Sequence, residues 1–311
     1  MNAEVNNPTE RFKPPLWLRN THVQTIGSSF FTRSPDIGAG RRIELLTSEA
    51  VRLEAFLHGE ANPGRQVILI HGWLGCADSS YILRTAADLL HAGYRVTRLN
   101  LRDHGNTAHM NEDMFHSART KEVVEACEQL TGLGSGANES PGSVIIGFSL
   151  GGNFALRVCA HTGIPALAIC PAINPETSCT AIDEGPAVYR HYFLRRWYRA
   201  LAAKAAAFPE RYDFSAVQNR TNVLELTNLF IGNHLPYPSS SEYFNAYRIR
   251  PESLQGKPAK IIAAKDDPVI PWQSVAELSS ATEVLLTDHG GHCGYVPKAW
   301  MTRQMLEFLR R

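Results

Sequence analysis

The sequence predicts an α/β fold in which a mostly parallel central sheet carries helices on both faces. Short apolar runs alternate along the chain with stretches of helical length and periodicity, a pattern typical of parallel sheets. An early pair of runs instead alternates apolar and polar residues, as a strand with one solvated face does. A third observation is a glycine-rich turn that joins one apolar run directly to a helical pattern.

The predicted strands fall into two kinds. The runs Ile43–Thr47 and Val51–His58 come first, and we expect them to form an antiparallel edge of the sheet. Later runs are short and largely apolar, which indicates strands buried on both faces. These are Val67–Ile70, Val144–Ile146, Ala166–Ile169 and Lys260–Ala264. Between and after them lie the helix-like stretches Ser79–Ala92, Ser117–Leu130, Leu150–Ala160, Trp272–Ser280 and Lys298–Leu309.

The alternation of strands and helices stops between residues 174 and 250. This stretch holds a basic, alanine-rich helical run (Tyr189–Ala207), a second helical run (Thr221–Gly232) and a turn at Pro236–Ser241. An insertion of this size beside a sheet is often a lid over the active site, and the alternative is a packing subdomain without a gating role. We expect an irregular N-terminal extension (1–40) that packs on the core, an α/β core (41–173 and 251–311) and a helical lid or cap (174–250).

Composition argues against a nucleic-acid-binding protein, a membrane protein and a secreted protein. The chain has 311 residues, of which 44% are apolar and 20% charged, as in ordinary soluble enzymes. Its 31 basic and 30 acidic residues give a net charge of +1, so no bulk attraction to nucleic acid or anionic membranes is expected. The longest apolar runs are about half of the roughly 20 residues that span a bilayer, and the polar N-terminus lacks a secretory signal. We expect a cytoplasmic protein whose six cysteines, which form no CxxC pair, are free thiols.

The strongest chemical signal is the segment GFSLGG at residues 147–152. It follows a predicted strand and precedes a predicted helix, which is the context that the G-x-S-x-G motif requires. The glycines on either side allow a sharp turn that lifts the Ser149 hydroxyl clear of the backbone. Ser149 is therefore the candidate nucleophile, although an ordinary glycine-rich turn is the alternative.

A serine nucleophile needs a histidine base and an acid that orients it, in the chain order Ser, Asp, His. The acid is expected after Lys260–Ala264, where Asp266 and Asp267 both lie; Asp267 is preferred because it stands four residues before Pro271. The base is expected after the last strand, Val284–Thr287. His292 is preferred there because glycines surround it, and His289 remains an alternative.

The oxyanion of an acyl-transfer intermediate needs two backbone N–H donors. One is expected from Leu150, the residue after the nucleophile. The other is expected from the loop after Val67–Ile70, which reads HGWLG at residues 71–75 and makes Trp73 the candidate. His71 in this loop is expected to hold the turn together rather than to act in catalysis.

Taken together, HGWLG, GFSLGG, KDDPVIP (265–271) and HGGHCG (289–294) resemble the α/β-hydrolase superfamily, from about Arg41 to the end of the chain. The segment PPLWLRNTHVQTI (14–26) is similar to the PPxWLxNxHxQTI opening of its YheT-like branch of predicted hydrolases and esterases. The resemblance implies an α/β-hydrolase fold with Ser149, Asp267 and His292 as the triad. Residues 99–105 resemble the loop after the fourth strand in this branch. The pair Asp103-His104 in this segment either holds the loop in place or forms a second acid–base site.

No cofactor or metal is expected. The glycine-rich run at residues 132–137 precedes a strand, whereas a dinucleotide-binding loop follows one. The twelve histidines include no HExxH motif.

The expected function is cleavage of carboxylic esters by a serine hydrolase through an acyl-enzyme. The expected partner is a small ester with an apolar acyl group, with no nucleic acid and no transmembrane segment. Two alternatives stay open: other acyl chemistry on the same triad (thioesterase, lipase or phospholipase, amidase, acyltransferase), and an inactive binding scaffold. The sequence does not indicate the oligomeric state, the acyl chain length or the role of the N-terminal motif.

Overall fold

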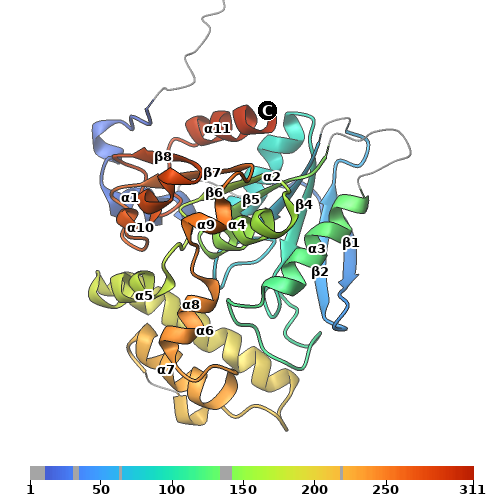
Figure 1. Cartoon of the computed structure of the whole chain (residues 1–311), viewed down its shortest axis with the longest axis vertical. Helices are drawn as coiled ribbons and strands as arrows, with labels where there is room; N and C mark the ends of the chain where they lie inside the picture. The colour runs from blue at the N-terminus through green and yellow to red at the C-terminus, as the bar shows by residue number, and fades with distance from the viewer. Residues whose placement is uncertain (1–10, 31–34, 63–64, 134–141, 218–219) are drawn as a thin grey trace, which may run out of the picture.

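Eight strands form one sheet in the order β1-β2-β4-β3-β5-β6-β7-β8 (Figure 1). The computed structural model describes residues 11–30, 35–62, 65–133, 142–217 and 220–311. The strands are β1 (Arg41–Leu46), β2 (Arg52–His58), β3 (Gln66–Ile70), β4 (Arg95–Asn100), β5 (Val144–Phe148), β6 (Ala166–Ile169), β7 (Ala259–Ala264) and β8 (Glu283–Thr287). β2 pairs antiparallel with β1 and with β4, and the other pairs are parallel. The expected parallel sheet with an antiparallel edge is confirmed.

Helices cover both faces of the sheet because its central strands are apolar on both sides. In β3, Val67 and Leu69 pack with one group of helices, and Ile68 and Ile70 pack with the other. The first group is α2 (Ser80–His91) and α11 (Ala299–Leu309). The second includes α3 (Thr120–Leu133), α4 (Leu150–Thr162), α9 (Pro251–Leu254) and α10 (Trp272–Ala276), which continues as the 3-10 helix η3 (Glu277–Ser280). The α/β-hydrolase-like arrangement expected from the sequence is therefore present.

Strand β4 is absent from the strands predicted above. Its sequence, RVTRLN, has polar residues at four of six positions, yet Arg98 is only 2% exposed. The guanidinium of Arg98 pairs with Asp78 and donates to the carbonyl oxygen of Ala77, and the Thr97 hydroxyl accepts a hydrogen bond from Gln66. These partners lie on other elements, so the apolar pattern of β4 alone gave no sign of a buried strand.

The N-terminal extension is not wholly irregular, so that expectation was wrong in part. It contains a 3-10 helix, η1 (Leu16–Leu18), and an α-helix, α1 (Thr21–Phe30). The Gln24 side chain is fully buried; its amide group donates to the carbonyls of Leu18 and Val296, and its carbonyl accepts from the Val296 N–H. The helix is thus held by contacts with a loop some 270 residues further along the chain, which local sequence does not reveal.

Between β6 and β7, the described residues of the insertion form four α-helices that lie below the sheet in Figure 1. They are α5 (Pro175–Glu184), α6 (Ala187–Ala207), α7 (Val223–His234) and α8 (Ser240–Tyr247), with the 3-10 turn η2 (Ser215–Val217) between α6 and α7. Helices α6 and α7 match the two predicted runs closely, whereas α5 and α8 were not predicted. Each begins with a side-chain N-cap that accepts a backbone N–H of the first turn: Asn174 caps α5 and Ser239 caps α8. The role of this insertion as a lid remains a prediction.

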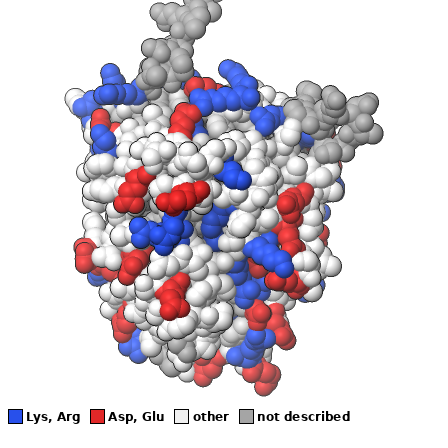
Figure 2. Space-filling view, in the orientation of Figure 1, with Lys and Arg blue, Asp and Glu red and all other residues white. Residues whose placement is uncertain are grey.

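Basic and acidic side chains are interspersed on the face of the molecule in Figure 2. This agrees with a net charge of +1. Within the described ranges, no helix combines the length and apolar character needed to cross a bilayer. Residues 134–141 lie outside the described part of the chain, and they include most of the glycine-rich run at 132–137. Helix α3 ends just before them.

Candidate active site

Ser149 occupies a strained turn between β5 and α4. Its backbone has φ 54° and ψ −119°, a left-handed conformation that residues with side chains rarely adopt. The turn is closed tightly: a Cβ at Gly147 would overlap the carbonyl oxygen of Gly151, and one at Gly151 would overlap that of Ile70. The two glycines are therefore required by close backbone approach, as the motif predicted.

A continuous chain of hydrogen bonds joins Ser149, His292 and Asp267. The distance from Ser149 Oγ to His292 Nε2 is 3.0 Å, and that from His292 Nδ1 to Asp267 Oδ2 is 2.9 Å. The other oxygen of Asp267 accepts from the backbone N–H groups of Val269 and Ile270. With Nδ1–H donated to the carboxylate, Nε2 is left to accept the serine proton, which is the tautomer a general base needs.

The electrostatic surroundings favour a protonated His292. Burial, the largest single influence, lowers the pKa of its imidazole, but the charge of Asp267, the neighbouring Cys293 and the hydrogen bond to Asp267 outweigh it. Together they raise the pKa of His292 from 6.5 to about 9. The imidazolium that forms when serine gives up its proton is therefore stabilised by this site.

Asp266 and His289, the alternative candidates for the acid and the base, lie next to the hydrogen bonds of Ser149, His292 and Asp267 but take no part in them. Asp266 accepts the backbone N–H of Gly291 at 2.8 Å, so it holds the loop that carries His292. Burial raises its pKa. His289 Nδ1 lies 3.7 Å from the other oxygen of Asp266. The structure thus brings together the three preferred residues, with Asp266 in a supporting position.

Trp73 and Leu150, the two expected oxyanion donors, line the same pocket as Ser149. Leu150 is the first residue of α4, where a backbone N–H has no partner within the helix. The loop that contains Trp73 packs against the serine, since a Cβ at Gly72 would lie 3.2 Å from Ser149 Cβ. The neighbouring N–H groups of Gly72 and Leu74 are already donated to the Tyr81 hydroxyl and to His104 Nε2, and Trp73 stays the predicted donor of this loop.

His71 and His104 hold loops rather than face the serine. His71 Nε2 accepts the N–H of Leu101, and His104 Nε2 accepts that of Leu74. Burial lowers the pKa of His71 to about 3 and that of His104 to about 4, so both are neutral. Neighbouring Asp103 pairs with Lys204 of α6 instead of with either histidine.

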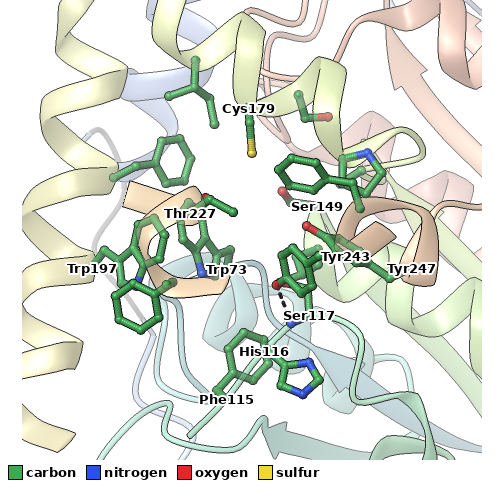
Figure 3. Close-up of a pocket in the computed structure, with 18 of the residues that line it drawn as sticks. Trp73, Phe115, His116, Ser117, Ser149, Cys179, Trp197, Thr227, Tyr243 and Tyr247 are labelled. Carbon is green, nitrogen blue, oxygen red and sulfur yellow. Dashed lines mark hydrogen bonds between the residues drawn. The ribbon is translucent and has the colours of Figure 1, made fainter. Parts of the chain in front are cut away.

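A largely apolar pocket opens at Ser149 (Figure 3). The core supplies Ser149, Trp73 and Phe115 to its lining, and the insertion supplies much of the remaining wall. Trp73 stacks on Phe193 and meets Trp197 edge to face, with ring centroids 5.5 and 5.0 Å apart. In Figure 3 the labelled side chains of Trp197 and Thr227 lie across the cavity from Ser149, and Cys179 lies above it.

Sequence reasoning missed the residues that hold the His292 loop from the N-terminal extension. The Thr25 hydroxyl accepts the backbone N–H of His292 at 2.9 Å, and the Gln24 side chain makes hydrogen bonds with both the N–H and the carbonyl oxygen of Val296. His22 Nδ1 lies 2.7 Å from the Tyr189 hydroxyl of α6, so α1 contacts both the base loop and the insertion. The PPLWLRNTHVQTI motif was the available signal, but its partners are distant in sequence.

One cluster of metal-ligating side chains occurs in the described ranges, formed by Cys170, His292 and Cys293. Their ligand atoms lie within 4.8 Å of one another. Both nitrogens of His292 are already hydrogen-bonded to Ser149 and Asp267, so the arrangement as it stands offers no free imidazole ligand.

The chain matches the model of the alpha/beta hydrolase family over residues 67–300. It is 24% identical to a protein of Escherichia coli (strain K12) named "Putative esterase YheT", an alignment that covers 99% of this chain and 95% of that protein. It is 21% identical to the phospholipase ABHD3 of Mus musculus over 94% of this chain and 75% of that protein.

Solved structures show the same fold. An esterase from Pyrococcus furiosus superposes with a TM-score of 0.59 at 19% identity, covering 87% of this chain and 90% of that one. Est1E from Butyrivibrio proteoclasticus, solved with ferulic acid bound, superposes with a TM-score of 0.56 at 17% identity, covering 86% of this chain and all of that one.

Proposed function

The chain belongs to the alpha/beta hydrolase family, and from this premise we propose that it is a serine hydrolase that cleaves carboxylic esters. The observation that carries the proposal is the unbroken chain of hydrogen bonds from Ser149 through His292 to Asp267, beside an apolar pocket. Relatives named as an esterase and as a phospholipase support the same class of chemistry.

In the proposed reaction, His292 Nε2 takes the Ser149 proton while Oγ attacks the acyl carbon of the ester. The N–H groups of Trp73 and Leu150 stabilise the oxyanion, each donor contributing about 10²–10³ in rate. His292 then protonates the departing alcohol and afterwards activates water, which releases the acid from Ser149. Asp267 keeps the imidazole in the required tautomer and stabilises its cation. No step requires a cofactor.

The substrate we propose is a small ester with an apolar acyl group. The aromatic side chains of Trp73, Phe193 and Trp197 next to Ser149 favour an apolar acyl chain over a charged one. A panel of p-nitrophenyl esters of increasing chain length, run beside acyl thioesters and anilides, distinguishes ester hydrolysis from thioester and amide chemistry. A cytoplasmic location remains a prediction from the sequence.

A fluorophosphonate probe tests the nucleophile. We expect covalent labelling of the wild-type protein at Ser149 and none of Ser149→Ala, with loss of ester hydrolysis in the same variant. Ser117→Ala is the matched control, because Ser117 lines the same pocket but does not contact His292, and it should still be labelled. Labelling that survives Ser149→Ala would remove Ser149 from this role. A folded protein that neither labels nor hydrolyses any ester would favour a binding scaffold.

A further inference from the structure

Two cysteines lie against each other beside the candidate base. Cys170 follows directly after β6, and Cys293 follows His292 in the chain. The sulfur of Cys170 accepts the backbone N–H of Cys293 at 3.4 Å, and the two sulfur atoms lie within 4.8 Å of each other. Each thiol also points to the other's segment: Cys170 Sγ lies 3.7 Å from the carbonyl oxygen of Gly291, and Cys293 Sγ lies 3.6 Å from that of Ile169.

Both cysteines have an unusual backbone conformation. Cys170 has φ 45° and Cys293 has φ 57°, a left-handed region that is rare for residues with a side chain. The fold holds both residues in this conformation while their sulfur atoms lie within 4.8 Å of each other. Packing alone would be served by glycine, which adopts this conformation without strain.

The pKa of Cys293 is shifted in the opposite direction from the pKa values of four other cysteines. A hydrogen bond from Cys170, and the nearby His292 and Lys298, lower the pKa of the Cys293 thiol against the opposing effects of burial and of the Asp267 charge. Burial instead raises the pKa of Cys170, and it raises those of Cys127, Cys159 and Cys179 to about 11 or 12. Cys293 is also partly exposed. A lowered pKa and partial exposure are the two properties that favour oxidation of a cysteine, and a second thiol, Cys170, lies beside it.

From this geometry we propose that Cys293 and Cys170 form a site of reversible oxidation by hydroperoxides. The Cys293 thiolate attacks the peroxide, breaking the O–O bond; the sulfur becomes a sulfenic acid, and the alkoxide takes a proton and leaves as an alcohol. The Cys170 thiol then attacks that sulfur, a disulfide forms, and water leaves. The peroxide gains the two electrons that the thiols lose, and an external dithiol later reduces the Cys170–Cys293 disulfide and is itself oxidised to a disulfide.

The consequence for activity rests on the proposed function. A disulfide requires a sulfur–sulfur distance of about 2.05 Å, so the two sulfur atoms must approach and the segment that carries Cys293 must shift. His292 is the preceding residue, and its bonds to Ser149 and Asp267 are 3.0 and 2.9 Å long. A displacement of about 1 Å at such a base costs roughly 10²-fold in rate. Oxidation should therefore reversibly inactivate the hydrolase.

The experiment treats the reduced, full-length protein with cumene hydroperoxide and measures intact mass, peptide linkage and ester hydrolysis in parallel. We expect a loss of two hydrogen atoms in mass, a Cys170–Cys293 cross-linked peptide, and at least a tenfold fall in hydrolysis that dithiothreitol restores. Absence of the cross-linked peptide would overturn the proposal. The peptide is mapped whether or not the protein hydrolyses esters, so its absence and a failure of the proposed function are separate results.

Variants decide which thiol reacts first. Cys293→Ser should keep its activity in hydroperoxide, whereas Cys76→Ser, a partly exposed cysteine outside the pair, should lose activity as the wild type does. Cys170→Ala should form no disulfide and should expose a sulfenic acid at Cys293, which dimedone labels. Dimedone labelling at other cysteines but not at Cys293 would contradict the assignment, even where one of the variants folds poorly.

Discussion

Lys204 of α6 and Asp103 of the core form a buried ion pair, with 3.0 Å between Nζ and Oδ1. The Lys204 ammonium also donates to the carbonyl oxygens of Asn111 and Asp113, so these hydrogen-bond acceptors, like Asp103, lie in the segment that follows β4. Burial lowers the pKa of Lys204 and raises that of Asp103, and the charge of each partner opposes this. The pair fastens the insertion to the core.

Removing one partner should therefore destabilise the protein strongly. Lys204→Met keeps much of the side-chain volume but leaves the Asp103 carboxylate buried without its cation, which typically costs about 3–5 kcal/mol. Urea unfolding followed by circular dichroism measures the change. The double variant Asp103→Asn/Lys204→Met should lose less than the two single variants together. A single variant as stable as the wild type would show that the pair does not fasten the insertion.

Ester hydrolysis should rise with pH through the ionisation of His292. Only the neutral imidazole accepts the serine proton, so a pKa raised to about 9 places the midpoint of kcat/KM well above the ordinary value of 6.5. Cys293→Ser removes one of the groups that raise this pKa, so its profile should move to lower pH. Steady-state kinetics between pH 6 and pH 10 measure both curves. A wild-type midpoint at or below 6.5 would contradict this account.

The two adjacent aspartates should differ sharply in their effect on catalysis. Asp267→Asn should lower kcat by about 10⁴-fold, because the amide no longer accepts the Nδ1 proton and favours the wrong tautomer. Asp266→Asn is the matched control: it alters one hydrogen bond to the base loop and should cost less than about tenfold. Comparable losses in both variants would mean that the assignment of the acid is wrong.

Thr25 should act on the turnover rate through the position of His292. Thr25→Val removes the acceptor for the His292 N–H, and we expect kcat to fall by about 10- to 100-fold with KM nearly unchanged. Thr25→Ser retains the hydroxyl and should restore most of the rate. A rise in KM with unchanged kcat, or no rescue by serine, would indicate a purely structural contact.

Thr227 of α7 offers a way to shorten the pocket. Thr227→Phe places a ring in the cavity opposite Ser149, so kcat/KM for long acyl chains should fall by at least about tenfold while acetate esters are unaffected. Thr227→Val keeps the size of the side chain and is the control. Equal losses for acetate and long-chain esters would show that the acyl chain does not occupy this space.

Local pattern was enough to predict the elements whose stability and chemistry are local. The GFSLGG turn lies between a strand and a helix that its own flanking residues specify, and the order of Ser149, Asp267 and His292 along the chain follows the order of the strands. Strand β4 and helix α1 escaped prediction because buried Arg98 and Gln24 are satisfied by partners on other elements. The sequence around a polar side chain does not show whether a distant residue will satisfy its hydrogen bonds when it is buried.

By itself, then, the sequence determined a parallel α/β sheet, a strained serine turn and the two loops that supply a candidate acid and base. The sequence preferred Asp267 over Asp266 from its spacing to Pro271, and only the tertiary structure shows that the Asp267 carboxylate is the one that reaches His292 Nδ1. Tertiary structure also decided that Thr25 holds the base loop and that Cys170 meets Cys293, 123 residues away. The physical reason is that hydrogen bonds and thiol contacts act over a few ångströms, and only the folded chain brings such distant residues within that range.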